Sequence, residues 1–214
     1  MTRRLTVPLP LSAGNPLRRA RNGMDDVRVS QTSHHPVRRA STDELSASQV
    51  QAIREMLEAA FGSDEEEKFT DDDWEHATGG VHFIIEAEGR VLAHAAVVQR
   101  ELHLGDRPIR TGYVEAVATA PGRQRQGLGT SVMREVGSYI NEHFQLGGLG
   151  TGSQGFYERL GWEIWQGPSA VRAPTGSQPT PDDDGYIMVL RTPSSPDIDL
   201  TDPISCEWRR GDVW

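Results

Sequence analysis

The stretch VEAVATAPGRQRQGLGTSVM (residues 114–133) combines a strand of small apolar residues, a basic turn with glycines and the start of an amphipathic helix. The N–H groups at a helix start lack partners, and the helix dipole gives them partial positive charge, so an anion binds favourably there. Gly127 and Gly129 would let a phosphate approach the main chain closely, and Arg123 and Arg125 add positive charge. No Gly-Lys-Ser/Thr follows, so this turn differs from a Walker A loop. We therefore expect an anion site at this turn.

Other positions carry side chains suited to acid–base chemistry or to binding a cation. Glu115 interrupts an apolar strand just before the basic turn, either as a solvent-facing acid or as a general base. Tyr157, in GFYERLGW, either packs a short helix onto a sheet or donates a proton. Asp182 and Asp183, in PDDDG, suit a turn, and their carboxylates also suit a cationic ligand. The residue types alone leave each of these alternatives open.

Several patterns that could indicate a cofactor or a reactive group lack the necessary context. The segment GTGSQG (residues 150–155) has the form Gly-x-Gly-x-x-Gly, but a dinucleotide fold needs an acid about 20 residues later, where this chain has SAVRAP. The seven histidines show no metal-ligand spacing, so we expect no metal. Cys206 is the single cysteine of the chain, which excludes an intrachain disulfide, and we interpret it as a small buried apolar residue.

The composition and charge limit the possible class of protein. The 214 residues carry a formal net charge of −9, which disfavours a nucleic-acid partner and favours a cationic one. Residues 1–33 are rich in Arg, Pro, Ser and Asn without periodicity, which predicts a disordered basic leader, and Met24 within it could be the true start. No apolar run approaches the ~20 residues of a membrane span. We expect a cytoplasmic protein with one domain at residues 34–214.

Helical spacing predicts a few well-marked helices. Ser46 and Gln49 form a capping box before the amphipathic run VQAIREMLEAAF, and Thr70 with Asp73 predicts a second helix start. The helical period returns at Gln126. A short helix is expected in QGFYERLGW.

Strand patterns account for most of the remaining chain. Residues 81–119 have the pattern of three antiparallel strands joined by turns with glycine. Further strands are expected at residues 144–149, 163–166, 186–192 and 204–210. The Pro-, Gly- and Asp-rich residues 172–185 predict a loop. Together these elements predict an α+β domain with a mixed sheet.

The basic turn and several rarer blocks resemble a known family. Residues 124–129, QRQGLG, match the Q/R-x-x-G-x-G/A pyrophosphate loop of the GNAT superfamily of acetyl-CoA-dependent N-acetyltransferases, in the same strand–turn–helix setting. The blocks FTDDDWEH, GYVEAVA, LGWEIWQGP, APTG, TPDDDG and CEWRRGDVW are similar to those of the aminoglycoside 2'-N-acetyltransferases. The resemblance extends from about residue 35 to the end of the chain and excludes the leader.

This resemblance implies a GNAT fold, with a central mixed, mostly antiparallel β-sheet, helices on both faces and a V-shaped acetyl-CoA cleft. It also implies acetyl-CoA as the acetyl donor, a homodimer, and no membrane or nucleic-acid partner. The donor-binding residues that it implies are Val117, Ala118, Thr119, Gln124, Arg125, Gln126, Gly127, Leu128 and Gly129.

The resemblance further implies a reaction in which the 2'-amine of an aminoglycoside attacks the thioester directly. Glu115 would be the general base, acting through water, and Tyr157 the general acid, while the N–H of Val117 would bind the acetyl oxygen. Trp214 would fold back so that its α-carboxylate joins the acceptor site. The substrate-binding residues implied are Asp64, Glu115, Ala116, Gly150, Asp182, Asp183 and Trp214.

This sequence departs from the family's pattern at two places, and two other functions remain open. EEEK is inserted after Asp64, and residues 150–155 form a shorter segment in which Gly150 stands where some relatives have serine. The same fold could acetylate another amine, such as a cell-wall amino sugar or a protein N-terminus. It could also be a CoA-binding module without catalysis, which would be favoured if Glu115 or Tyr157 pointed away from the thioester.

Overall fold

Two long antiparallel strands, β3 (Arg90–Leu104) and β4 (Arg107–Thr119), form the centre of the fold in the computed structural model, which describes residues 35–62 and 68–214. With β2 (Val81–Ala87) they form the three-stranded antiparallel meander expected from the sequence. The other elements are β1 (Arg38–Ser41), η1 (Thr42–Glu44), α1 (Ala47–Phe61), α2 (Asp71–Ala77), α3 (Leu128–His143), β5 (Leu146–Gly150), α4 (Gln154–Glu158), β6 (Glu163–Ile164), β7 (Ser169–Ala173), β8 (Gly176–Pro179), η2 (Pro181–Asp183), β9 (Ile187–Arg191) and β10 (Ile204–Glu207).

The described strands form one ten-stranded sheet in which β6-β9-β5-β4-β3-β10-β7-β8 are successive neighbours. The first half of β3 also pairs with β2, which in turn pairs with β1. The pairs β4–β5 and β10–β7 are parallel, and the other pairs are antiparallel. The expected mixed, mostly antiparallel sheet is therefore confirmed.

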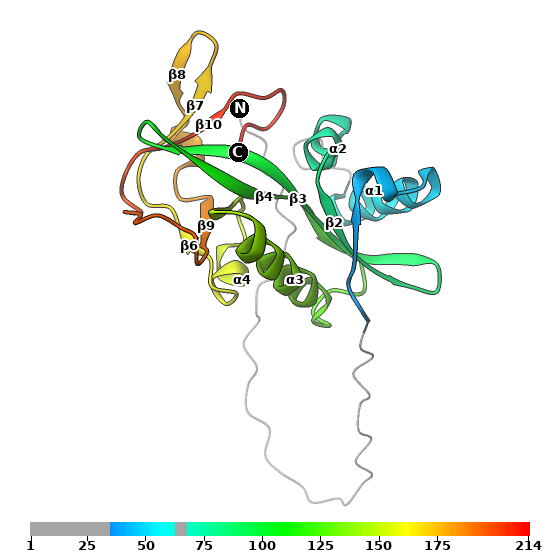
Figure 1. The fold of residues 1–214 in the computed structure, drawn as a ribbon. Coiled ribbons are helices and arrows are strands. Elements are labelled where there is room, and N and C mark those ends of the chain that lie inside the picture. Colours follow the sequence, from blue (N-terminus) through cyan, green and yellow to red (C-terminus); the bar gives the residue numbers. More distant parts are fainter. Residues whose placement is uncertain (1–34, 63–67) are drawn as a thin grey trace, which may run out of the picture.

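Helices cover both faces of this sheet (Figure 1). The pair α1 and α2 lies on one side of β3 and β4, and α3 with α4 lies on the other. Small residues on β3 and β4 let both layers approach closely: Ala95 packs in the cluster under α3, while Ala96 and Ala118 pack in the cluster under α1. A third cluster, around Trp165 and Trp214, fills the end of the sheet near β10.

The helix starts follow the capping signals in the sequence. Ser46 accepts from the N–H of Gln49 at the start of α1, and Thr70 with Asp73 forms the reciprocal capping box of α2. The third helix begins two residues later than expected, because Gly127 has a left-handed backbone (φ 84°) and is its N-cap.

The prediction of a loop over residues 172–185 is wrong in part. Strands β7 and β8 form a hairpin there, with Arg172 paired to Ser177, and the short helix η2 and a turn follow. The residues of β8 are all exposed at the edge of the sheet. An edge strand without a buried face shows no apolar alternation, so periodicity could not identify it.

Some expectations fall on residues that the structure does not describe. The basic leader at residues 1–33, Met24 within it, and Asp64 with the first three residues of the EEEK insertion all lie outside the described part. Among the described helices, none is long and apolar enough to cross a membrane.

Adjacent glycines in β5 let large side chains pack against both faces of this short strand. A Cβ on Gly147 would lie 2.9 Å from Leu190 Cβ and 3.1 Å from the Trp162 ring. We therefore expect Gly147→Ala to lower the free energy of unfolding by about 1–3 kcal/mol through overpacking. Urea denaturation measures this change.

Gly137→Ala in α3 is the matched control, because a Cβ there meets only Leu190 Cδ2 at an ordinary 3.7 Å. Alanine should stabilise that helix position by about 0.5–1 kcal/mol. The packing account of β5 is wrong if Gly147→Ala leaves stability unchanged or raises it as Gly137→Ala does.

Candidate active site

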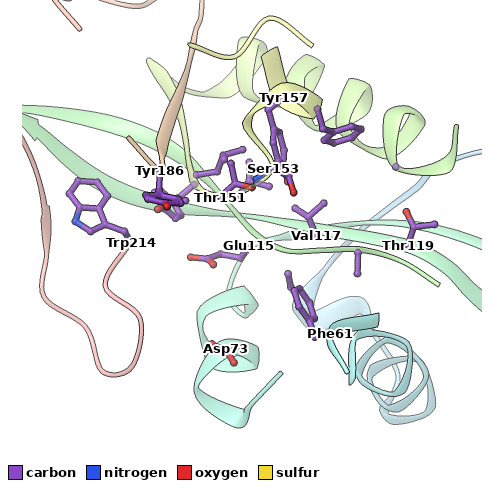
Figure 2. Close-up of a pocket in the computed structure, with 18 of the residues that line it drawn as sticks. Phe61, Asp73, Glu115, Val117, Thr119, Thr151, Ser153, Tyr157, Tyr186 and Trp214 are labelled. Atoms are coloured by element: carbon purple, nitrogen blue, oxygen red, sulfur yellow. Dashed lines mark hydrogen bonds between the residues drawn. The ribbon is translucent and has the colours of Figure 1, made fainter. Parts of the chain in front are cut away.

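A pocket of about 370 Å³ runs along β4, where β5, α4, the turn before α3 and the C-terminal segment (residues 208–214) converge. Figure 2 shows its extent: Trp214 lies at one end, Val117 and Thr119 at the other, and Glu115 between them. The carboxylate of Glu115 points toward the Trp214 end. The pocket therefore has two halves that meet at the middle of β4.

A β-bulge in β4 lies where the two halves meet. The register between β3 and β4 shifts there, so that Ala116 and Val117 lie opposite the single residue Ala95. Ala116 has a φ of 51°, a left-handed conformation that costs a non-glycine residue about 1 kcal/mol or more. A bulge redirects its neighbours, and Glu115 and Val117, on either side of Ala116, both line the pocket.

The pocket opens where β4 and β5 separate. In the described register, their parallel pairing ends at Tyr113 and Gly148, although β4 continues to Thr119 and β5 to Gly150. Residues beyond these last pairs line the pocket from both strands. This separation is the V-shaped cleft expected from the sequence, and an extended ligand can enter between the strands.

The turn before α3 forms the half of the pocket beside Thr119. Gly127 is the N-cap of α3, and no side chain caps the N–H groups of the first turn. The space around the position of a Cβ on Gly127 is open, so an anion can approach these N–H groups. Arg125 lines the same half of the pocket. These features fit the diphosphate of a CoA-type ligand.

Most of the donor-binding residues expected from the sequence line the pocket. Gln126 does not, because its side chain turns back and donates to the carbonyl of Gly122 at 3.2 Å. Leu128 does not either, because it packs in the core under α3. The expected donor-binding residues that line the pocket are Val117, Ala118, Thr119, Gln124, Arg125, Gly127 and Gly129.

The other half of the pocket is acidic. Asp73, Glu115, Asp183 and Asp212 all line it. Asp182 is exposed and is not among the lining residues. The expected acceptor residues that line the pocket are Glu115, Ala116, Gly150, Asp183 and Trp214.

Glu115 is paired with an arginine of the C-terminal segment. Arg209 Nη1 donates to Glu115 Oε1 at 2.6 Å, and its Nε donates to the carbonyl of Asp212 at 2.6 Å. The guanidinium also lies over the ring of Tyr113, 5.7 Å from its centre. Burial is the largest single effect and disfavours the charge of Arg209, but Glu115, Tyr113 and Asp212 together outweigh it, so the pKa of Arg209 is raised. Arg209 therefore fixes one carboxylate oxygen of Glu115.

Asp212 is the acid whose protonation the site perturbs most clearly. Burial raises the pKa of Asp212 to about 7, against the opposing effect of Arg209 and with a further contribution from Asp183. Its carboxylate also accepts from the N–H of Trp214 at 3.4 Å. Asp212 thus titrates near neutral pH and changes the charge of the acidic half of the pocket.

The C-terminal segment is anchored in the fold. Trp214 is buried, and its indole N–H donates to Thr180 Oγ1 at 3.0 Å. A Cβ on Gly150 would lie 3.3 Å from the carbonyl carbon of Trp214, so the glycine leaves room for this chain end. His76 on α2 contacts the carbonyl of Arg210 at 2.8 Å and holds the segment from the other side.

Tyr157 both packs the core and lines the pocket. Its ring makes edge contacts with Phe156 and Trp162, at centroid distances of 4.9 and 6.1 Å. Figure 2 shows the side chain extending from α4 with its hydroxyl toward Val117. Burial raises the pKa of Tyr157, which keeps the hydroxyl protonated at neutral pH. The two sequence alternatives, packing and proton donation, are thus compatible.

Sequence reasoning missed several lining residues. Asp73 was assigned only to the capping box, yet it also lines the pocket. Arg209 and Arg210 are indistinguishable in CEWRRGDVW, but only Arg209 reaches Glu115.

Cys206 is buried, as expected, and burial raises the pKa of its thiol to about 11. Among the described residues, no group of three His, Cys, Asp or Glu side chains is placed to hold a metal, and the absence of a metal stays a prediction.

Comparison with known proteins defines the class. The family described as "Acetyltransferase (GNAT) domain" matches residues 41–165. The fold is similar to a GNAT family acetyltransferase from Brucella melitensis in complex with acetyl-CoA, with a TM-score of 0.54, 19% identity, and coverage of 83% of this chain and 98% of that one. It is also similar to the GNAT family N-acetyltransferase YhbS from Escherichia coli in complex with CoA, with a TM-score of 0.56, 18% identity, and coverage of 80% and 89%. The fold is that of a GNAT acetyltransferase.

A curated relative narrows this class. An aminoglycoside 2'-N-acetyltransferase from Mycolicibacterium fortuitum is 42% identical over 184 residues, which cover 84% of this chain and 92% of the relative. The chain therefore belongs to the aminoglycoside 2'-N-acetyltransferase family of the GNAT superfamily.

Asp212 should make stability depend on pH. Its pKa is about 7 in the fold and 3.8 without the fold, so the native state binds the proton more tightly and wild-type stability falls as pH rises through this window. Asp212→Asn removes this loss. Relative to wild type, the variant should gain on the order of 1 kcal/mol or more between pH 4 and pH 8 in urea unfolding.

Asp106→Asn, in the exposed turn between β3 and β4, is the control for replacing a carboxylate with an amide, and the change in Asp212→Asn is measured against it. If Asp212→Asn shows no greater change with pH, burial does not perturb Asp212 as described.

Proposed function

We propose that this acetyltransferase transfers the acetyl group of acetyl-CoA to the 2'-amino group of aminoglycosides. The observation that carries the proposal is one pocket with an anion-binding turn in one half and four carboxylates in the other, joined at Glu115. An aminoglycoside carries several ammonium groups, so an acidic half suits it, and the relative from Mycolicibacterium fortuitum bears this activity in its name.

The donor half would bind acetyl-CoA through the main chain. Its diphosphate would take the N–H groups at the start of α3, with Gly127 and Gly129 giving access and Arg125 adding charge. The pantetheine would lie between the separated strands β4 and β5. The acetyl oxygen would then accept a hydrogen bond from the N–H of Val117, which stabilises the negative charge that develops during attack.

The acceptor half would bind ammonium groups and prepare one of them for attack. Asp73, Asp183, Asp212 and the end of the chain at Trp214 surround the site where the amino sugar would lie. Because Arg209 fixes one oxygen of Glu115, the other oxygen is the acceptor for a proton from the 2'-amine through water.

The proposed reaction is a direct displacement. The neutral 2'-amine attacks the acetyl carbon, a C–N bond forms and the C–S bond breaks. The amine proton passes through water to Glu115, and Tyr157 gives its proton to the leaving thiolate. Glu115 and Tyr157 both line the pocket, which is the placement that catalysis requires and that a non-catalytic CoA-binding module does not.

A thiol-release assay with acetyl-CoA and either kanamycin B or kanamycin A tests the proposal. The two acceptors share their other amines but differ at the 2' position, where kanamycin B has an amine and kanamycin A a hydroxyl. We expect turnover with kanamycin B alone. Turnover with both would move the site of attack, and turnover with neither would favour another amine as the acceptor.

The Glu115→Gln variant tests whether thiol release depends on the proposed general base. It should lower kcat with kanamycin B by about 10²-fold or more, since a general base contributes roughly that much, while CoA affinity by calorimetry stays nearly unchanged. Glu158→Gln, on the exposed surface of α4, should leave both quantities unchanged. Equal turnover of Glu115→Gln and wild type would contradict the role of Glu115.

A further inference from the structure

A chain of hydrogen bonds connects the β-bulge with the loop before β2, and no step of the reaction uses it directly. The carbonyl oxygen of Ala116 lies 2.8 Å from His94 Nδ1, and His94 Nε2 lies 2.9 Å from His82 Nδ1. His82 Nε2 lies 2.9 Å from Thr42 Oγ1, which accepts from the N–H of Gly79 at 3.0 Å. Both imidazoles are fully buried, His94 on β3 and His82 on β2.

The direction of this chain follows from its two ends. Burial lowers the pKa of His94 to about 3 and that of His82 to about 4, so both rings are neutral near pH 7. A neutral imidazole has one N–H donor and one nitrogen acceptor. Because the carbonyl of Ala116 can only accept, His94 donates to it from Nδ1 and accepts from His82, and His82 accepts from the hydroxyl of Thr42. Each imidazole nitrogen then has one partner and one role.

One end of this chain is Ala116, a strained residue that lines the pocket. Ala116 has a φ of 51°, a region in which glycine is the favoured residue. The hydrogen bond from His94 holds the carbonyl of that same residue. Rotation of this peptide would turn its N–H, which belongs to Val117. Loss of the left-handed φ of Ala116 would change the direction of the preceding side chain, Glu115.

We infer that His94 and His82 are positioning residues of the acetyltransferase, because their hydrogen-bond chain holds the left-handed bulge that directs Glu115 and the Val117 N–H into the pocket. This inference rests on the roles proposed above for those two groups. Two histidines that do not line the pocket would thus contribute to the turnover rate through the backbone of Ala116.

A double-mutant cycle separates this role from simple packing. His94→Leu places an apolar side chain of similar size at this position, which cannot donate a hydrogen bond. It should lower kcat with kanamycin B by about tenfold or more, as loss of a positioned N–H does. Its CoA affinity, set largely at the distant turn before α3, should change by less than about threefold. Adding Ala116→Gly removes the penalty of a positive φ, and should therefore restore kcat in the His94→Leu background more than it changes kcat in the wild-type background.

Ala93→Gly is the matched control, since Ala93 lies on the neighbouring strand β3 without a left-handed backbone and does not line the pocket, and glycine there should give no rescue. If Ala116→Gly changes kcat by the same factor in both backgrounds, the histidines do not act through the bulge and the inference is overturned.

A second pair of variants covers the case in which His94→Leu does not fold. The amide nitrogen of an asparagine can occupy the place of Nδ1, whereas that of a glutamine lies closer to the place of Nε2. His94→Asn should therefore retain the hydrogen bond to Ala116 and exceed His94→Gln in kcat by about tenfold. Equal kcat values for the two variants would overturn the inference.

One further readout does not depend on the acceptor. In ¹⁵N-labelled protein without ligand, the amide resonance of Val117 should move in His94→Gln and return toward its wild-type position when Ala116→Gly is added. If wild type fails to turn over kanamycin B but this pattern appears, the proposed function fails while the role of the histidines at the bulge stands. If the resonance stays in place in His94→Gln, the histidines do not hold the bulge.

Discussion

The geometry of the active site depends on the way β4 leaves its neighbours on either side. Toward β5 the pairing stops after Tyr113, and toward β3 the bulge at Ala116 and Val117 shifts the register. A regular strand would bury its N–H groups in the ladder and point alternate side chains at fixed faces. Here the same few residues give an opening between two strands, and Glu115 and Val117 both line it. The two halves of the pocket, proposed to bind donor and acceptor, meet because both are built around this irregular strand.

The second determinant of the site is a balance of charge. Four carboxylates in one pocket would repel one another, and Asp212 shows this effect together with burial in its raised pKa. Arg209 offsets part of that repulsion through its bond to Glu115. The C-terminal segment that carries Arg209 is itself fixed by Trp214 at Thr180 and by His76 on α2. The acidic half of the pocket therefore suits a polycation, and Arg209 holds one of its acids, Glu115, in place.

The sequence predicted those features that depend on a few neighbouring residues. The capping boxes at Ser46 and Thr70, the meander and the helix after the basic turn all have local signals, and the structure confirms them. The strand β8 was missed because an exposed edge strand has no apolar alternation.

The contacts that complete the site join residues far apart in the chain. The pair Arg209–Glu115 spans 94 residues, and the bond between His82 and His94 requires the exact pairing of β2 with β3. No spacing rule in the sequence encodes either of them. Asp73 was missed for a different reason. Its spacing from Thr70 is fully explained by helix capping, so nothing in the sequence indicated that it also lines the pocket.

The most direct test of this account is the amide resonance of Val117 in ¹⁵N-labelled protein, compared between complexes with CoA and with acetyl-CoA. The two ligands differ only in the acetyl group, so the comparison isolates the hydrogen bond that the bulge would donate. The account predicts a downfield proton shift of the Val117 amide with acetyl-CoA relative to CoA. The same position of this resonance in both complexes would contradict the claim that the bulge directs an N–H at the acetyl oxygen.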